Sequence, residues 1–437
     1  MIPIACRREP ARHSSKAEWR HCLAIAVLTP RPAARTAALV LLIAFLCNMV
    51  GRGVGDAFMV FVLPLSEEFG WRRAQVTSVY SMYLVMNGLG APLTGMLIDR
   101  WGPRVVYPLG LVLLGSACLM AAHLSEIWQF QVCIGIVAGL GTSMVGMLPA
   151  SMLISRWFRE RMSTAMGFAY AGFGTGTILL VPLAQHSIEL QGWRDTYELM
   201  GIVLLALLPL LLLLPWRRIA NPPGVALTRE RDNAAAVSRW QLLRSALRTR
   251  AYWQIATLFS FTALTTFSVI TQVVPFWVES GLTPLEAATA FGTAGLLSVL
   301  GIPVSGWAGD RFGPRATVTF SFVFTLAGIV SLVAFSLWPS RWLVVAYVLC
   351  FGTMFGARGP IVSSLAARHF AGPGFATIYG TLFAWMSVAG ALGGFIAGLL
   401  YDATGGYRAG LFFSIACGLV ALSPFWMPRP LVARPDR

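Results

Sequence analysis

Twelve apolar segments, each long enough to cross a lipid bilayer as a helix, fill most of this sequence. A membrane-spanning helix needs about 20 apolar residues, so twelve of them use roughly 240 residues and leave about 200 for loops and tails. This pattern restricts the chain to a polytopic membrane fold. The predicted spans are 37–63, 74–97, 105–122, 127–154, 163–186, 196–215, 251–276, 286–308, 316–337, 342–366, 375–400 and 408–427.

Composition agrees with a membrane-embedded chain. Of the 437 residues, 57% are hydrophobic and only 12% are charged. An average soluble protein carries about 25% charged residues, so this composition excludes a soluble globular enzyme and a disordered chain. The seven cysteines show no CxxC spacing, and most lie in apolar runs, where cysteine behaves as a small hydrophobic residue. Neither a disulfide framework nor a metal site is predicted.

The distribution of basic residues predicts the orientation of the chain. With the N-terminus inside, 26 of the 33 lysines and arginines fall in tails and loops on one side, five fall on the other side, and two lie within spans. Basic residues in short loops are retained on the cytoplasmic side. Both termini are therefore predicted to be cytoplasmic, and the net charge of +15 needs no nucleic-acid partner to explain it.

A ten-residue run occurs twice, 211 residues apart. The sequence GMLIDRWGPR at 95–104 returns as GWAGDRFGPR at 306–315. A repeat at this spacing indicates two six-helix halves of the same orientation, related by an axis along the membrane normal. The fold class predicted is all-α integral membrane, with twelve transmembrane helices in two pseudo-symmetric six-helix bundles. The predicted parts are a basic cytoplasmic tail at 1–36, halves at 37–215 and 251–427, a cytoplasmic linker at 216–250 and a cytoplasmic tail at 428–437.

The repeated run lies on the short loop after the second span of each half. Its glycines permit a tight reversal and a close helix approach. Its aspartates can accept hydrogen bonds from helix N-terminal amides, and its arginines can pair across the loop or bind lipid phosphate. The alternative is that these residues only anchor the topology. The candidate gating residues are Gly95, Asp99, Arg100, Gly102 and Arg104 in the first half and Gly306, Asp310, Arg311, Gly313 and Arg315 in the second.

These loops resemble the signature loop of the major facilitator superfamily, and the resemblance covers roughly residues 37–427. Two stretches resemble its monocarboxylate-transporter-like branch. One contains Pro64 and the run Phe-Gly-Trp-Arg at 69–72, and the other is 156–161 followed by Gly167 and Gly172. The resemblance implies that the two repeated loops latch the cytoplasmic side of the halves in an outward-open state.

Arg52 and Asp56 form a charged pair near the middle of the first predicted span. A charge at that depth costs about 2.5–3.5 kcal/mol on insertion scales and marks a functional site by default. The i, i+4 spacing puts both side chains on one helix face. Glycines at 51, 53 and 55 favour local unwinding that would offer backbone groups to a ligand. A role in substrate binding or coupling is predicted, and the alternative is a structural ion pair.

Arg358 lies in the tenth predicted span, between Gly356 and Pro360. A guanidinium in a polar cavity is suited to bidentate recognition of a carboxylate. The alternative is a helix kink that the arginine stabilises. With Arg52, it leaves two intramembrane cations against one acid, which favours an anionic substrate.

Other polar side chains on the spans expected to face the pathway are further candidates for substrate binding. Each of them can equally serve as a hydrogen bond between helices. They are Tyr80 and Asn87 in the second span, Thr262 and Thr266 in the seventh and Tyr379 in the eleventh.

The sequence predicts a transporter and not an enzyme. It contains no GxxxxGK[ST] motif and no metal-ligand spacing among its five histidines, so no cofactor and no metal are expected. The predicted function is alternating-access transport of a small organic anion, a monocarboxylate, by proton symport or exchange. A drug or metabolite exporter of the same fold is the alternative. The expected partners are the anion, protons and the lipid bilayer, and the expected form is a multi-pass monomer in a bacterial inner membrane.

Overall fold

The computed structural model describes residues 32–220, 239–372 and 374–427, and helices account for nearly all of them. The predicted tails and linker lie wholly or partly outside these residues. In chain order the helices are α2 (Pro32–Phe69), α3 (Arg73–Trp101), α4 (Pro103–Ala121), α5 (Ile127–Phe130), the π-helix η2 (Gln131–Ala138), α6 (Gly139–Val145), α7 (Met147–Trp157), α8 (Met162–Ala206), α9 (Leu208–Leu213), α10 (Trp216–Ala220), α12 (Arg239–Leu247), α13 (Arg250–Ile270), α14 (Val273–Glu279), α15 (Pro284–Phe312), α16 (Pro314–Phe335), α17 (Arg341–Tyr347), the π-helix η3 (Val348–Gly352), α18 (Arg358–His369), α19 (Phe375–Thr404) and α20 (Arg408–Trp426).

These helices account for the twelve predicted spans. Among the described residues, ten stretches are long and apolar enough to cross a membrane. One of them, Met162–Leu213, contains predicted spans five and six, which meet at Gly192, where φ is 88°. The tenth predicted span is divided between α17, η3 and α18, which are too short to be counted. The prediction of an all-α membrane protein with twelve spans is confirmed.

Each half reverses direction after its second span through the same Gly-Pro pair. Gly102 and Gly313 have φ values of 74° and 84°, and Pro103 and Pro314 begin the next helix. Glycine adopts a positive φ without a steric penalty. Proline suits the first position of a helix because its φ is fixed and its missing N–H has no partner there. The repeated run is therefore a turn of the same construction in both halves.

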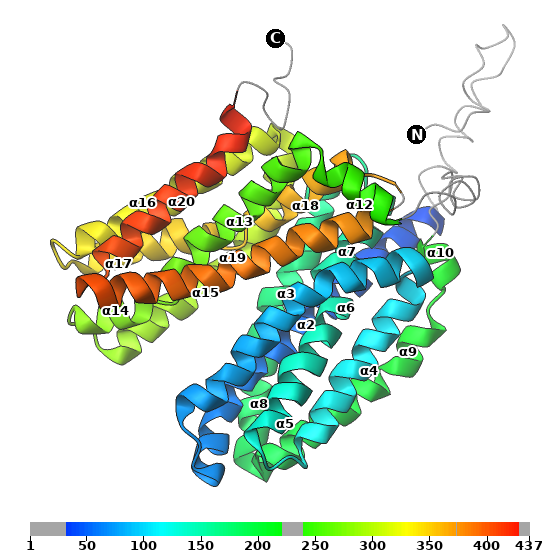
Figure 1. Ribbon diagram of the computed structural model, residues 1–437, viewed down its shortest axis with the longest axis horizontal. Helices are drawn as coiled ribbons and strands as arrows, with labels where there is room; N and C mark the ends of the chain where they lie inside the picture. The colour runs from blue at the N-terminus through cyan, green and yellow to red at the C-terminus, as the bar shows by residue number, and fades with distance from the viewer. Residues whose placement is uncertain (1–31, 221–238, 373, 428–437) are drawn as a thin grey trace, which may run out of the picture.

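The helices form two bundles that meet at one end and separate toward the other (Figure 1). The first bundle runs from α2 to α10 and the second from α12 to α20. Figure 1 shows them close together near α7, α12 and α18, and apart toward α5 and α14. We call the end that carries the turns at Gly102 and Gly313 the closed end, and the opposite end the open end.

Glycines allow the backbones to touch across the seam at the closed end. Here α3 packs against α19, and α8 packs against α15. A Cβ atom added to Gly95 would lie 2.2 Å from the carbonyl oxygen of Ala376, and one added to Gly306 would lie 2.3 Å from that of Ser163. No larger residue fits at either position unless the bundles move apart.

The same helices separate toward the open end. On α8, a Cβ atom added to Gly174 would still lie 2.3 Å from Val299 of α15. One turn and two turns farther along α15, Cβ atoms added to Gly295 and Gly292 would meet nothing within 4 Å. The contact between α8 and α15 therefore extends from Gly306 to about Val299 and ends there.

These glycines of α15 provide a test of the seam. We expect Gly306→Ala to lower the stability by about 1–3 kcal/mol, the usual cost of overpacking, because its methyl group would meet the backbone of α8. Gly292→Ala is the matched control and should gain up to about 1 kcal/mol of helix propensity without a clash. Thermal unfolding of the two variants in detergent would show the difference. Equal unfolding temperatures would contradict the packing of the closed end.

Candidate functional site

A carboxylate in the first span is held by donors from three helices. Arg52 Nε donates to Asp56 Oδ2 at 2.9 Å within α2. The Tyr80 hydroxyl of α3 donates to Oδ1 at 2.8 Å, and the Thr177 hydroxyl of α8 donates to Oδ2 at 2.6 Å. Arg52, Asp56 and Tyr80 are sequence candidates, whereas Thr177 is not. No local pattern links Thr177 to Asp56, because their contact depends on how α8 crosses α2.

This cluster lies where the bundles begin to separate. Gly88 of α3 and Gly174 of α8 both contact the opposite bundle. Tyr80 is about 12 Å farther along α3 toward the open end than Gly88, and Thr177 is one turn farther along α8 than Gly174. The side chains of Arg52 and Asp56 are 36% and 12% exposed. The cluster is thus partly exposed at the inner limit of the open end.

The guanidinium of Arg52 has unused hydrogen-bonding capacity. Among the described residues, only its Nε donates to a protein group. Its two terminal nitrogens can therefore donate to a ligand, in the parallel geometry that fits a carboxylate. Because Asp56 neutralises Arg52, the cluster carries no net charge in this state.

The first span stays helical around the charged pair, contrary to the expectation of local unwinding. Helix α2 is continuous from Pro32 to Phe69. Its glycines admit neighbouring groups instead. A Cβ atom on Gly53 would lie 2.8 Å from the carbonyl oxygen of Gly176, and one on Gly55 would lie 1.9 Å from the Tyr83 hydroxyl oxygen. Close packing explains these glycines, and the expectation that they expose backbone ligands is wrong.

Arg358 lies inside the second bundle and faces α16. It is 2% exposed. Its Nη1 donates to the hydroxyls of Thr325 at 2.7 Å and Ser321 at 3.2 Å, and its guanidinium carbon lies 4.3 Å from the centre of the Phe322 ring. Its Nε is buried without a partner among the described residues. The guanidinium is held by hydroxyls and an aromatic ring.

A break in the helix of the tenth span explains why the side chain of Arg358 points toward α16. Gly356 has a φ of 77°, and α18 begins two residues later at Arg358. The next residue, Gly359, faces the first bundle, because a Cβ atom there would lie 3.6 Å from the Tyr170 ring. The side chain of Arg358 consequently points into its own bundle. The structure does not put it at the seam, where the sequence led us to expect it.

Each repeated aspartate accepts hydrogen bonds from a helix of the opposite bundle. Asp99 Oδ2 accepts from the amide and the hydroxyl of Thr377 at 3.0 and 2.7 Å. Asp310 accepts from the amides of Ser163 and Thr164 at 3.2 and 2.7 Å, and from the Thr164 hydroxyl at 2.9 Å. These donors lie in the first turns of α19 and α8, where amides lack partners within the helix and negative charge is favoured. The duplication thus produces two reciprocal contacts across the seam.

Three of the four arginines of the repeated loops, Arg100, Arg311 and Arg315, contact aromatic rings of their own bundle. Arg100 and Arg104 are exposed. Arg311 lies 5.6 Å from the centre of the Trp307 ring, and Arg315 lies 4.2 Å from a ring of Trp426. A different arginine, at position 368, pairs with Asp310 at 3.3 Å.

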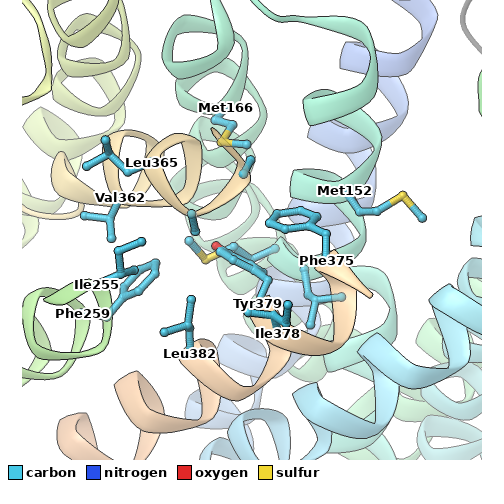
Figure 2. Close-up of a cluster of buried hydrophobic side chains, with 14 of the residues drawn as sticks. Met152, Met166, Ile255, Phe259, Val362, Leu365, Phe375, Ile378, Tyr379 and Leu382 are labelled. Carbon is cyan, nitrogen blue, oxygen red and sulfur yellow. The ribbon is translucent and has the colours of Figure 1, made fainter. Parts of the chain in front are cut away.

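Tyr379 belongs to a buried hydroxyl cluster between the bundles and not to the partly exposed site. Its hydroxyl lies 2.6 Å from that of Ser363 and 3.4 Å from that of Tyr170, which also bonds to Ser151. Figure 2 shows Tyr379 among apolar side chains of both bundles, including Met152, Met166, Phe259, Val362 and Leu382. The bundles are sealed here, so the expectation that Tyr379 lines an open binding site is wrong for this state.

The remaining polar candidates are separate from the Asp56 cluster. Thr262 and Thr266 lie on α13 of the second bundle, and Asn87 lies two turns from Tyr80 on α3. The Thr262 hydroxyl is buried without a partner among the described residues.

Comparison of the sequence with known families and relatives agrees with this architecture. The sequence profile of the Major Facilitator Superfamily matches residues 41–371 and again 259–436. Monocarboxylate transporter 13 of Rattus norvegicus is 27% identical over 398 residues, which cover 88% of each chain. The uncharacterized MFS-type transporter YcxA of Bacillus subtilis (strain 168) is 24% identical over 390 residues, which cover 88% of this chain and 92% of the relative.

Solved structures show the same fold. The proton:xylose symporter XylE aligns with a TM-score of 0.72 at 16% identity, over 91% of this chain and 96% of its own. FucP in the outward conformation aligns with a TM-score of 0.68 at 17% identity, over 89% of this chain and 98% of its own. The duplicated bundles, the family match and these alignments together show that the chain belongs to the major facilitator superfamily, as a multi-pass membrane transporter similar to its monocarboxylate-transporter-like branch.

Proposed function

We propose that this transporter carries a small organic anion of the monocarboxylate class together with a proton. The Arg52–Asp56 pair carries the proposal, since it is partly exposed at the inner limit of the open end and leaves two guanidinium nitrogens for a carboxylate. The names of relatives, among them monocarboxylate transporters 13 and 11, support the same substrate class.

Charge balance supports coupling to a proton. A substrate carboxylate that binds Arg52 competes with Asp56 for the same cation. The site would then hold two carboxylates against one guanidinium in a medium of low dielectric constant, which is costly. Protonation of Asp56 restores neutrality, and the hydroxyls of Tyr80 and Thr177 can reorient to partner the neutral acid. One anion and one proton then cross together without net charge movement.

The two ends of the seam serve as alternating gates in this proposal. The closed end faces the cytoplasm of a bacterial cell, an orientation supported by exposed arginines such as Arg100, Arg104, Arg217 and Arg244 at that end. Asp99 and Asp310 hold it shut while the site is open to the other side. The substrate drives the change only because its affinity differs between the two states.

Uptake into proteoliposomes tests the function. We expect labelled monocarboxylates to enter when the outside is more acidic than the lumen, at a rate that a clamped membrane potential does not change. Arg52→Gln should raise KM on the order of 10–100-fold, the value of a charge-assisted hydrogen bond. Asp56→Asn should abolish the dependence on the pH gradient.

Arg194→Gln is the matched control, because Arg194 pairs with Glu68 on an exposed surface of the open end. It should leave KM unchanged. Wild-type kinetics for Arg52→Gln would contradict the proposed site. Resistance to amphiphilic cations on overexpression, with no carboxylate uptake, would support the exporter alternative instead.

The variant Arg358→Met tests whether the buried cation of the second bundle takes part in substrate binding. We expect the unfolding temperature to stay the same or to rise, because the buried cation has no carboxylate partner among the described residues. We expect KM to stay within about twofold, since an interaction that the substrate never makes cannot change its binding. A rise in KM like that of Arg52→Gln would show that Arg358 contacts the anion in another state of the cycle.

If Asp99 and Asp310 hold the closed end shut, removing their charges should increase the fraction of molecules in which this end is open. Met166 is fully buried at the seam, so a cysteine introduced there, in a chain whose native cysteines are replaced, reacts with maleimide only when the closed end opens. We expect Asp99→Asn combined with Asp310→Asn to speed labelling roughly 3–30-fold, since each charge near a helix N-terminus is worth about 0.3–1 kcal/mol. Asp402→Asn, exposed at the open end, is the control. Equal labelling rates for the parent protein, the double variant and the Asp402→Asn control would contradict the role of Asp99 and Asp310 in holding the closed end shut.

A further inference from the structure

Helix α12 is a short amphipathic helix at the closed end of the second bundle (Figure 1). Leu243 and Ala246 are buried, whereas Arg244 between them is exposed. The helix packs against α19 and α13. Its apolar side therefore rests on the bundle, and its basic side is left outside.

Three exposed arginines lie within seven residues here. Arg244 and Arg248 are one helical turn apart, and Arg250 begins α13. No ion pair among the described residues involves any of them, and Arg250 reaches only the sulfur of Met427, at 3.7 Å. We call these three residues the α12 basic patch. It combines a concentrated positive charge with side chains that are free to bind an anion.

A tryptophan beside the patch indicates its depth in the membrane. Trp253 follows Arg250 by one turn of α13, is half-exposed, and donates its Nε1–H to the Leu247 carbonyl at 2.8 Å. Its ring contacts that of Trp385, also half-exposed, at 6.2 Å. An exposed tryptophan near the end of a span, such as Trp253, marks the interface between hydrocarbon and headgroups. The α12 basic patch lies next to Trp253 and hence at the level of the lipid phosphates.

The apolar side of α12 contacts the turn that begins α19. A Cβ atom added to Gly374 would lie 3.1 Å from Leu242 Cδ1. Gly374, with a φ of 80°, is the residue that precedes α19, and Thr377 in the first turn of that helix donates to Asp99 of the opposite bundle. Helix α12 therefore supports the turn that positions Thr377 for its hydrogen bond to Asp99, one of the two reciprocal contacts across the seam.

We propose that the headgroups of acidic phospholipids bind the α12 basic patch and thereby favour the closed state of this end. Acidic lipids attract basic residues held near a membrane surface. A lipid bound here retains α12 at the membrane interface, where Leu242 supports the turn at Gly374. Binding shifts the equilibrium because the supported turn presents Thr377 to Asp99, a contact across the seam that exists only while this end is closed.

The experiment uses the full-length protein that carries Met166→Cys and whose native cysteines are replaced. It is reconstituted in phosphatidylcholine alone or in phosphatidylcholine mixed with phosphatidylglycerol, and the rate of maleimide labelling is measured. In detergent, the shift in unfolding temperature caused by short-chain phosphatidylglycerol measures binding itself. We expect phosphatidylglycerol to slow labelling severalfold and to raise the unfolding temperature, and the combined variant R244Q, R248Q and R250Q to lose both effects.

Two controls separate this site from general charge attraction. The variant R217Q with R218Q removes two exposed arginines of α10, at the closed end of the other bundle, and should keep both effects of the lipid. Leu242→Ala should keep the shift in unfolding temperature but lose the slower labelling. The proposal is overturned if the triple variant responds to phosphatidylglycerol like the wild type, if the α10 variant loses the response equally, or if inorganic phosphate reproduces it.

Discussion

A carboxylate placed inside a bilayer must be neutralised and hydrogen-bonded, and the way Asp56 meets this requirement organises the transporter. Its three donors come from α2, α3 and α8. Two of these helices, α3 and α8, are the ones that pack across the seam against α19 and α15. A ligand that takes Arg52 away from Asp56 therefore changes the contacts that bind α2 to both seam helices of its bundle. In the proposed mechanism, substrate binding and the packing of the seam are therefore connected through the single side chain of Asp56.

The closed end is built from contacts that are individually weak and easily reversed. Glycine backbones touch at Gly95 and Gly306, and two aspartates accept hydrogen bonds from the first turns of opposing helices. Between them lies the buried cluster of hydroxyls around Tyr379. The ion pairs Arg52–Asp56, Arg194–Glu68, Arg341–Glu286 and Arg368–Asp310 each lie within one bundle. Opening of the closed end therefore leaves these pairs intact and exposes polar groups that water can satisfy. Because the two halves are duplicated, the aspartate contact occurs twice, and the bundles are held at two points instead of hinging about one.

Features that depend on residues close together in the chain, or on a repeat within it, could be predicted from the sequence, whereas features that depend on how helices pack could not. Apolar length and the repeat predict the spans and the two bundles, since both depend only on the chain itself. Helical spacing predicts that Arg52 meets Asp56, and dipole arguments predict that Asp99 meets helix amides. What fails is the direction in which a helix faces. The break at Gly356 turns Arg358 into its own bundle, and the contact of Thr177 with Asp56 depends on how two helices cross. Neither is encoded in any local spacing.

The most direct test of the role of Arg52 and Asp56 is the number of protons that the protein takes up when it binds an anion. Binding of a small monocarboxylate to the purified protein, followed by calorimetry in two buffers that differ in ionisation enthalpy, reports how many protons the complex takes up. Exchange of partners at Arg52 predicts an uptake that approaches one proton per anion in the wild type and disappears in Asp56→Asn. An anion that binds with no proton uptake in the wild type, or with the same uptake in both proteins, would contradict the role assigned to this pair.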